Sequence, residues 1–400
     1  MDSIPGYDAL VAAYWRAHDP ALTQREIGEK ANLGTQAQVS RLLAEAREKG
    51  VLREIFQFPT DLPADLRHQI ENSFFKRHSA LENALAYRAR ILNDTRSEGG
   101  SFFKRLHVVP APGLEKENDA ATRDKAFRTF GASAAEIITE YIDLTDECCV
   151  AWGNAIEATV RHVRSRSTSG TLKQFIPIAG EPTNHEPNGV SPSDAARILA
   201  SAWPGSSYLS LRGVQARIPK SVYAHDEHQI ARELAAYSKN YQQIFGQPRS
   251  SDYPRISRVP MILTEVDDAQ TSRDPTRIGN ADPWYLETQD AEDPNVLELA
   301  VGNIGGVWIA RSELPLEEKA KVEQVNKRWL GAQHMDFVRC SRTADLERGR
   351  PGVVVLAVEP EKKNIILEAI YLINVLVISR QLADALADEL LLPATQTGPS

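Results

Sequence analysis

Residues 148–160, CCVAWGNAIEATV, begin as an apolar run and end with the spacing of a helix. The five residues from Cys148 to Trp152 fit a strand that is buried on both faces, because such strands lack alternating polar positions. Gly153-Asn154 fits a turn, and the residues from about Ala155 onward fit a helix. A strand that leads directly into a helix is the unit from which parallel sheets are built, so this segment predicts an α/β fold.

The same alternation continues on both sides of this segment. Strands are expected at 106–111, 174–180, 208–213, 258–267, 352–359 and 373–378, and helices at 126–142, 191–203, 362–370 and 380–391. Apolar strands between helices predict a parallel sheet covered on both faces. Ligands of such sheets bind beyond the carboxyl ends of the strands, so the residues that follow each strand form the candidate site.

The first 60 residues have a different pattern, typical of short helices. Thr23 with Glu26, and Thr35 with Gln38, have the spacing of capping boxes. A turn with Gly34 separates the two helices, and Gly50 suits the end of the second. The second helix carries one apolar stripe, made of Val39, Leu42, Leu43 and Ala46. Two short helices joined by a tight turn predict a helix-turn-helix motif.

In such a motif the second helix enters the major groove of DNA. Its outward residues near the start are the candidate DNA contacts: Thr35, Gln36, Gln38, Ser40 and Arg41. Glutamine can pair with adenine, and arginine with guanine or phosphate. The alternative is a helical hairpin used only for packing or dimerisation. Residues 1–60 hold seven Lys or Arg against eight Asp or Glu, which favours that alternative, whereas the turn and both caps favour DNA.

Composition limits the remaining classes of function. Four hundred residues suit two or more units, and a net charge of −8 means that any nucleic-acid surface must be local. Three cysteines exclude a disulfide framework, and the start MDSIPGYDAL lacks the features of a signal peptide. We therefore expect a soluble cytoplasmic protein without a membrane partner. HDEHQ at 225–229 fits the start of a helix better than a metal site, so no metal and no cofactor are predicted.

The N-terminal segment LTQREIGEKANLGTQAQVSRLLAEAREKGVLRE (22–54) resembles SorC/DeoR-type sugar-responsive transcriptional regulators. Four later segments resemble segments of that family, in the same order: VAWGNAIEATV (150–160), FIPIAGEP (175–182), ELAVGNIGGVWIARS (298–312) and GVVVLAVEPEKKNIILEAIYLINVLVISRQLADAL (352–386). The third of them, 298–312, resembles a loop of the family. The resemblance implies a helix-turn-helix domain at 1–56 and a helical connector at 57–105, with an insertion between about Phe74 and Phe102. It further implies an α/β effector domain at 106–393, similar to the sugar-phosphate isomerase and CoA-transferase superfamily, and a tail at 394–400.

In that family the strand end that corresponds to Gly153 holds a sugar phosphate. The effector-binding residues implied here are Gly153, Asn154, Ala155, Gly180, Glu181, Asn303 and Lys362. The sequence departs from the family pattern at four places. Hydroxyl residues are missing at 155–156, Glu359-Pro360 replaces a glycine pair, Asn303 replaces an aspartate, and Ile378-Ser379-Arg380 replaces Thr-Asp-Glu. A sugar, a sugar phosphate and a polyol therefore all remain open as effectors.

The resemblance implies a regulator without enzymatic activity that binds operator DNA and a small-molecule effector as a homodimer or homotetramer. An enzyme of the isomerase or CoA-transferase type with a helical appendage is the alternative. It would use one of the carboxylates Glu181, Glu265 and Glu359, and no partner for any of them is visible in the sequence. A third alternative is a scaffold whose larger domain only oligomerises.

Overall fold

The computed structural model describes residues 7–18, 22–31, 33, 35–48, 64–95, 103–113, 120–164, 172–181, 190–218, 235, 238–246, 254–269 and 296–391. The chain divides into two compact units, residues 1–71 and 72–400. Gly34, Gly50 and the HDEHQ segment lie outside the described residues. The four-part division expected from the sequence stays a prediction.

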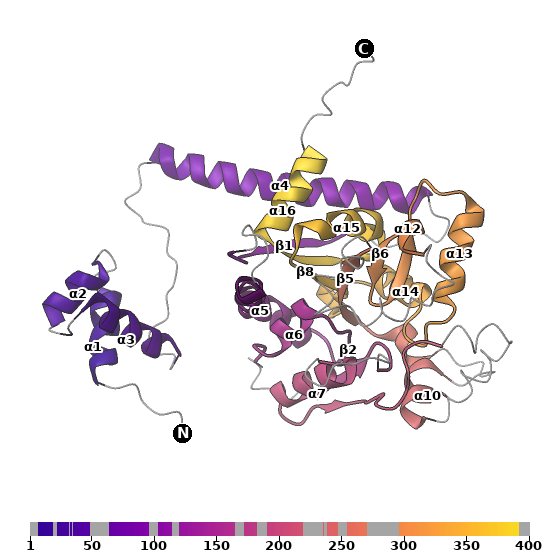
Figure 1. The fold of residues 1–400 in the computed structure, drawn as a ribbon, viewed down its shortest axis with the longest axis horizontal. Helices are drawn as coiled ribbons and strands as arrows, with labels where there is room; N and C mark the ends of the chain where they lie inside the picture. Colours follow the sequence, from indigo (N-terminus) through magenta and orange to yellow (C-terminus); the bar gives the residue numbers. More distant parts are fainter. Residues whose placement is uncertain are drawn as a thin grey trace, which may run out of the picture. The chain divides into compact units, whose positions relative to one another are not determined.

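The first unit contains α1 (Tyr7–His18), α2 (Gln24–Ala31) and α3 (Gln36–Glu48), drawn in indigo in Figure 1. Both predicted capping boxes are present. The Thr23 N–H donates to Glu26 Oε2 at 2.7 Å, and the Thr35 N–H donates to Gln38 Oε1 at 2.7 Å. The three helices enclose a small core of Ala9, Ala12, Ala13, Leu22, Ile27, Val39, Leu43 and Ala46. The helix-turn-helix arrangement predicted from the sequence is therefore confirmed.

The second unit is built on a sheet with the strand order β1-β9-β8-β5-β2-β3-β4, in which all neighbouring strands are parallel. The strands are β1 (Arg105–Val109), β2 (Glu147–Val150), β3 (Gln174–Pro177), β4 (Ser207–Tyr208), β5 (Met261–Asp268), β8 (Gly352–Ala357) and β9 (Val375–Ser379). An antiparallel hairpin of β6 (Ala300–Ile304) and β7 (Val307–Ala310) extends from β5. The predicted α/β class is confirmed.

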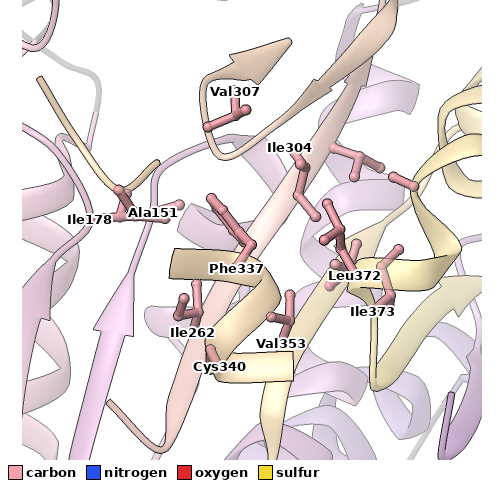
Figure 2. Packing of buried hydrophobic residues seen from close by; sticks show 14 of the residues in the cluster. Ala151, Ile178, Ile262, Ile304, Val307, Phe337, Cys340, Val353, Leu372 and Ile373 are labelled. Carbon is pink, nitrogen blue, oxygen red and sulfur yellow. The ribbon is translucent and has the colours of Figure 1, made fainter. Parts of the chain in front are cut away.

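Helices cover both faces of this sheet, so each strand contributes to two cores. In β2, for example, Cys149 packs into one core and Cys148 and Val150 into the other. One face carries α5 (Ala120–Asp143), α6 (Asn154–Val160) and α7 (Pro192–Ala202). The opposite face carries α14 (His334–Arg342), α15 (Lys363–Ala369) and α16 (Arg380–Leu391). Figure 2 shows part of this second core, where Phe337 of α14 lies among Ile262, Val353 and Ile304. Strands buried on both faces explain why their sequences are apolar throughout.

Shorter helices complete the unit: α10 (Lys239–Phe245), α12 (Val296–Leu299) and α13 (Leu316–Asn326), with the 3₁₀ turns Arg255–Arg258, Leu346–Arg348, Pro360–Lys362 and Ile370–Leu372.

In the described part of the connector lies the helix α4 (Ala64–Thr95), whose side chains are described from His78 onward. Leu81, Leu85 and Ala89 are buried in the core of the second unit. The Leu106 N–H donates to Glu82 Oε2 at 2.8 Å, which ties the helix to the first strand. Residues 78–95 are therefore an integral part of the second unit rather than a surface decoration.

Two local predictions were wrong. The strand expected at 208–213 ends at Tyr208, because Leu209 and Leu211 turn into the core and the chain then pairs with Glu181 through Gln215. The segment 298–312 was expected to be a loop, whereas it forms the β6–β7 hairpin. Gly305 and Gly306, with φ of 55° and 88°, supply the positive φ that a tight hairpin turn requires.

Candidate functional site

The carboxyl ends of β8, β5, β2 and β3 lie side by side along one edge of the sheet. Neighbouring strands are about 4.8 Å apart, so these four ends span roughly 14 Å. Lys362 follows β8, Gly153 follows β2, and Gly180-Glu181 follows β3. The topology therefore brings six of the seven predicted effector-binding residues, all except Asn303, to this edge, as expected for an α/β fold.

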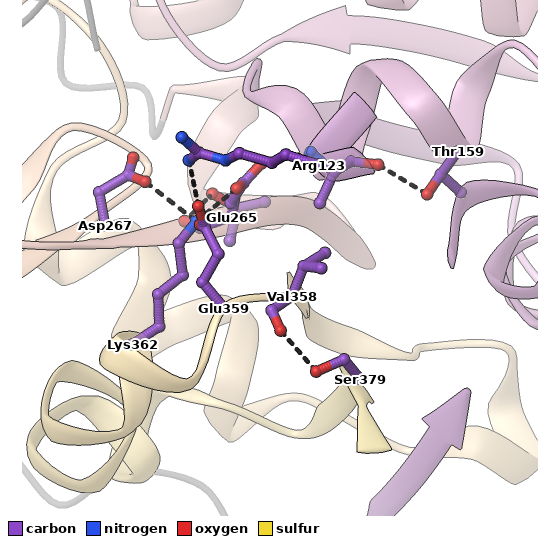
Figure 3. A network of polar contacts seen from close by, with 10 residues as sticks. Arg123, Thr159, Glu265, Asp267, Val358, Glu359, Lys362 and Ser379 are labelled. Atoms are coloured by element: carbon purple, nitrogen blue, oxygen red, sulfur yellow. Dashed lines mark hydrogen bonds and ion pairs between the residues drawn. The ribbon is translucent and has the colours of Figure 1, made fainter. Parts of the chain in front are cut away.

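A network of charged side chains fills the middle of this edge, and Figure 3 shows it. The Lys362 ammonium lies 2.5 Å from Glu265 Oε1, 3.1 Å from Asp267 Oδ1 and 3.4 Å from Glu359 Oε2. The side chain of Lys362 is only 4% exposed. An ammonium has three N–H groups, and here each of them has a carboxylate within reach.

Arg123, from the first turn of α5, forms an ion pair with Glu359 on the outer side of the network. The network thus contains three carboxylates and two cations, so its formal charge is −1. Glu265 and Glu359 are buried, whereas the side chains of Asp267 and Arg123 are 31% and 30% exposed. A molecule approaching from solvent would therefore meet Asp267 and Arg123 first.

The second carboxylate oxygen of Glu265 lies at the start of α6. The Ala155 N–H donates to Glu265 Oε2 at 3.0 Å. Gly153 precedes the helix with φ of 129°, and a Cβ at that position would lie 2.2 Å from the same oxygen. The glycine is therefore needed both for its backbone conformation and because a buried carboxylate occupies the space beside it.

Burial and the neighbouring charges shift the pKa values in this network. Burial raises the pKa of Glu265 to about 7, and Lys362 opposes this shift. For Glu359, burial would raise the pKa, but Lys362 and Arg123 outweigh it and the pKa lies below its usual value. Burial would lower the pKa of Lys362, but its three carboxylate neighbours raise it well above the usual value. With one carboxylate in excess, the network takes up its first proton on Glu265.

A pH dependence of stability follows for Glu265. Its pKa is about 7 in the folded protein against an ordinary 4.5, so the folded state binds more protons within this window. The resulting stabilisation, on the order of 3 kcal/mol, is present below pH 4.5 and is lost as the pH rises through 7. Between pH 5.5 and pH 8.5 we expect the free energy of unfolding of the wild type to fall relative to that of Glu265→Gln, which has no carboxyl group to ionise. Urea titration of both proteins at each pH measures this difference. A difference independent of pH would contradict the assignment.

Gly180 and Glu181 lie at the end of β3, where the chain pairs with residues 214–216. The Glu181 N–H donates to the Val214 carbonyl at 2.7 Å, and a Cβ on Gly180 would lie 2.2 Å from that carbonyl oxygen. Gly180 therefore permits a close approach of two backbones. The Glu181 side chain is half-buried, and its Oε1 is buried without a hydrogen-bond partner among the described residues.

Two predicted residues have a role different from the expected one. Asn303 is buried in β6, where its Oδ1 accepts a hydrogen bond from the Gly306 N–H at 3.2 Å and so supports the hairpin turn. Its backbone lies opposite Asp267 in the register of β5 and β6. Asn154, also among the predicted effector-binding residues, is the first residue of α6; Gly153 is the N-cap residue, the remote Glu265 carboxylate accepts the Ala155 N–H, and the Asn154 side chain is exposed.

Trp152 directly precedes Gly153 in the chain. It is half-buried rather than fully buried as its apolar strand suggested, and its ring lies 5.9 Å from that of the buried Trp329. An aromatic ring held by a second ring is a rigid apolar surface of the kind that lines small-molecule sites.

The five candidate DNA contacts of the first unit are all exposed: Thr35, Gln36, Gln38, Ser40 and Arg41. Val39 and Leu43 lie on the opposite side of the same helix and are buried in the core, so the side of α3 with the candidate contacts faces solvent. The amide oxygen of Gln38 is used in the capping box, so its amide nitrogen is the group left to face a ligand. These residues stay predictions as DNA contacts.

Sequence reasoning missed most of the charge network. Glu265 was considered only as a catalytic candidate, and Glu359 as such a candidate and as the replacement of a family glycine; no partner was predicted for either, whereas both have partners. Asp267 and Arg123 were not singled out. A glutamate inside the apolar run MILTEV was a usable signal, because a buried charge requires a partner.

Among the described ranges, no group of three or more His, Cys, Asp or Glu side chains is placed to hold a metal ion. No helix in the described part of the chain is long and apolar enough to cross a membrane.

Comparison with solved structures shows the same fold in transcriptional regulators. The full-length sorbitol operon regulator SorC from Klebsiella pneumoniae superposes with a TM-score of 0.52 at 17% identity, over 94% of this chain and 98% of that chain. A transcriptional regulator from Streptococcus pneumoniae TIGR4 has a TM-score of 0.51 at 13% identity, over 79% of this chain and 98% of that chain. The resemblance noted in the sequence therefore extends to the fold.

No protein-family model matches the sequence, and no curated protein matches it either.

Proposed function

We propose that this protein is a DNA-binding transcriptional regulator whose α/β unit senses a small metabolite: a sugar, a sugar phosphate or a polyol. The observation that carries the proposal is the combination, in one chain, of a helix-turn-helix with an exposed second helix and an α/β fold shared with full-length SorC over 94% of the chain. The enzyme and scaffold alternatives give the exposed face of the second helix no role in binding DNA.

The metabolite binds at the edge formed by β8, β5, β2 and β3, where Trp152 supplies an apolar surface and Glu181, Asp267 and Lys362 supply polar groups. Binding there shifts the population between forms that hold the operator and forms that do not, which requires different affinities of the effector for the two forms. The protein works in the cytoplasm as a homodimer or homotetramer, and its operator is palindromic because the protein is symmetric.

A mobility-shift assay with the DNA upstream of the protein's own gene tests the proposal. We expect a sequence-specific shift at moderate salt that a sugar, sugar phosphate or polyol modulates. Absence of any sequence-specific shift, both with and without metabolites, would refute the proposal.

Arg41→Ala is expected to weaken operator binding by about 10- to 100-fold, because a base or phosphate contact of an arginine contributes about 1–3 kcal/mol. Ligand-induced stabilisation of the second unit should be unchanged. Arg128→Ala, which removes the same charge from an exposed position on α5, is the matched control and should bind the operator like the wild type. Equal affinity of the Arg41 and Arg128 variants would remove Arg41 from the interface.

An enzyme of the isomerase or CoA-transferase type is the second candidate, and the observation in its favour is Glu265. A buried carboxyl group with a pKa of about 7 at the end of a strand fits general acid–base catalysis. Against it, both oxygens of Glu265 are held by Lys362 and Ala155. Sugar-phosphate isomerase turnover that is lost in Glu265→Gln would support this candidate over the regulator.

A further inference from the structure

The groups that would hold an anion at the centre of the site are already bound to carboxylates of the same chain. The Lys362 ammonium contacts Glu265, Asp267 and Glu359, and Arg123 is paired with Glu359. The Ala155 N–H donates to Glu265 Oε2. Glu265 thus joins the lysine to the backbone after β2 and occupies the position that an incoming anion would need.

The charge balance of the network also opposes an anion. Its formal charge is −1, since three carboxylates face two cations. A phosphate dianion among these carboxylates would meet like charges, which repel it strongly at contact distance in a poorly solvated site. An anion would therefore have to displace Glu265 from Lys362 before it could bind.

Hydroxyl groups, by contrast, find acceptors at this edge. Asp267 is partly exposed at the outer side of the network. Glu181 Oε1, at the end of β3, is buried and has no hydrogen-bond partner within the described part of the chain. A buried carboxylate oxygen without a partner is unfavourable, and a hydroxyl donor on a bound molecule would remove that cost. The strand ends that carry these acceptors are separated by β2, at a spacing that a molecule with several hydroxyl groups can bridge.

We infer that Glu265 acts as an internal counter-anion for Lys362, so that the site accepts a neutral polyhydroxylated molecule and excludes a phosphorylated one. The inference rests on the proposed sensing function and narrows its effector class. It makes Glu265 the residue that determines specificity. Asp267 and Glu181 accept hydrogen bonds from the hydroxyl groups of the effector.

The test uses the full-length chain at pH 8, where Glu265 is ionised, with inorganic phosphate as the probe and potassium chloride at equal ionic strength as the control. The wild type should show no saturable rise in melting temperature with millimolar phosphate. Glu265→Ala should gain one, with an affinity at least about tenfold higher. The gain should vanish in Glu265→Ala/Lys362→Met. Glu265→Gln, which keeps the size of the side chain, serves if the alanine variant does not fold.

Saturable phosphate binding of similar affinity in the wild type and in Glu265→Ala would overturn the inference. So would a result in which neither Glu265→Ala nor Glu265→Gln shows a saturable rise in melting temperature with phosphate. A second arm compares glucitol with glucitol 6-phosphate in the release of the wild type from its operator. Release by the phosphorylated compound alone would also overturn it. Failure of the wild type to bind DNA would refute the regulator function instead, and the phosphate comparison would still decide the role of Glu265.

Discussion

Replacing Lys362 with methionine is expected to lower the free energy of unfolding of the 72–400 unit by about 3–5 kcal/mol, because removing one partner leaves buried charges uncompensated. Lys362 contacts three carboxylates, two of which are buried. Methionine keeps most of the apolar stem, so the loss reports on the charge rather than on a cavity. The loss should be larger at pH 8 than at pH 6, since Glu265 is protonated at the lower pH.

Urea unfolding followed by tryptophan fluorescence measures this loss, because five of the six tryptophans belong to the 72–400 unit. Lys363→Met is the matched control. Lys363 is the next residue, and its ion pair with Glu389 is partly exposed to solvent, so its removal should cost less than about 1 kcal/mol. Glu265→Gln/Lys362→Met should recover part of the loss, because it removes one of the uncompensated carboxylates. Equal losses in the two single variants would show that the network is not a buried charge cluster.

The class of fold was predictable because the signals for it are local. Strands such as Val353–Leu356 are apolar throughout, and they lie between segments with helical spacing, so the parallel sheet followed from the sequence. The capping boxes at Thr23 and Thr35 are also local, since each joins residues three positions apart. The β6–β7 hairpin had a local signal too, the Gly305-Gly306 pair between apolar runs, and a resemblance to a loop obscured it.

The centre of the site was not predictable, because it is assembled from distant parts of the chain. Arg123 and Glu359 are 236 residues apart, and Glu265 and Lys362 are 97 residues apart. The sequence places the end of each strand at the ligand edge, but it does not state which charges meet there. Lys362 was predicted as a site residue, and its three carboxylate neighbours make it the centre of an internal network.

At two predicted effector-binding positions the structure shows a contact within the chain, and their role toward an effector stays a prediction. Gly153 was predicted as a place of close approach to a ligand, and the structure places the Glu265 carboxylate of the same chain there. Asn303 was expected to face the effector, and it supports a hairpin turn instead. A short polar residue after a strand fits both turn chemistry and ligand binding, and only its neighbours in space distinguish the two.

Gly153→Ala is expected to have the second large effect, for two separable reasons. An alanine at φ of 129° and ψ of 165°, a region essentially restricted to glycine, strains the backbone by about 1–3 kcal/mol. The added Cβ would also lie 2.2 Å from Glu265 Oε2, so the carboxylate must leave the Ala155 N–H. Disturbing a buried charge network adds a further loss, for a total of roughly 3–5 kcal/mol.

Gly213→Ala separates the two reasons. Gly213 also has a positive φ, 81°, but a Cβ there would meet no atom of the described residues within 4 Å. Its alanine variant should therefore show the backbone strain alone, about 1–2 kcal/mol. Urea unfolding at pH 8 measures both variants, and the difference between them reports on the contact with Glu265. In Gly153→Ala/Glu265→Ala, where the opposing carboxylate is absent, the cost of the Gly153 substitution should fall to that of Gly213→Ala. An undiminished cost in that double variant would mean that Gly153 is needed only for its backbone conformation, and that Glu265 does not occupy the space beside it.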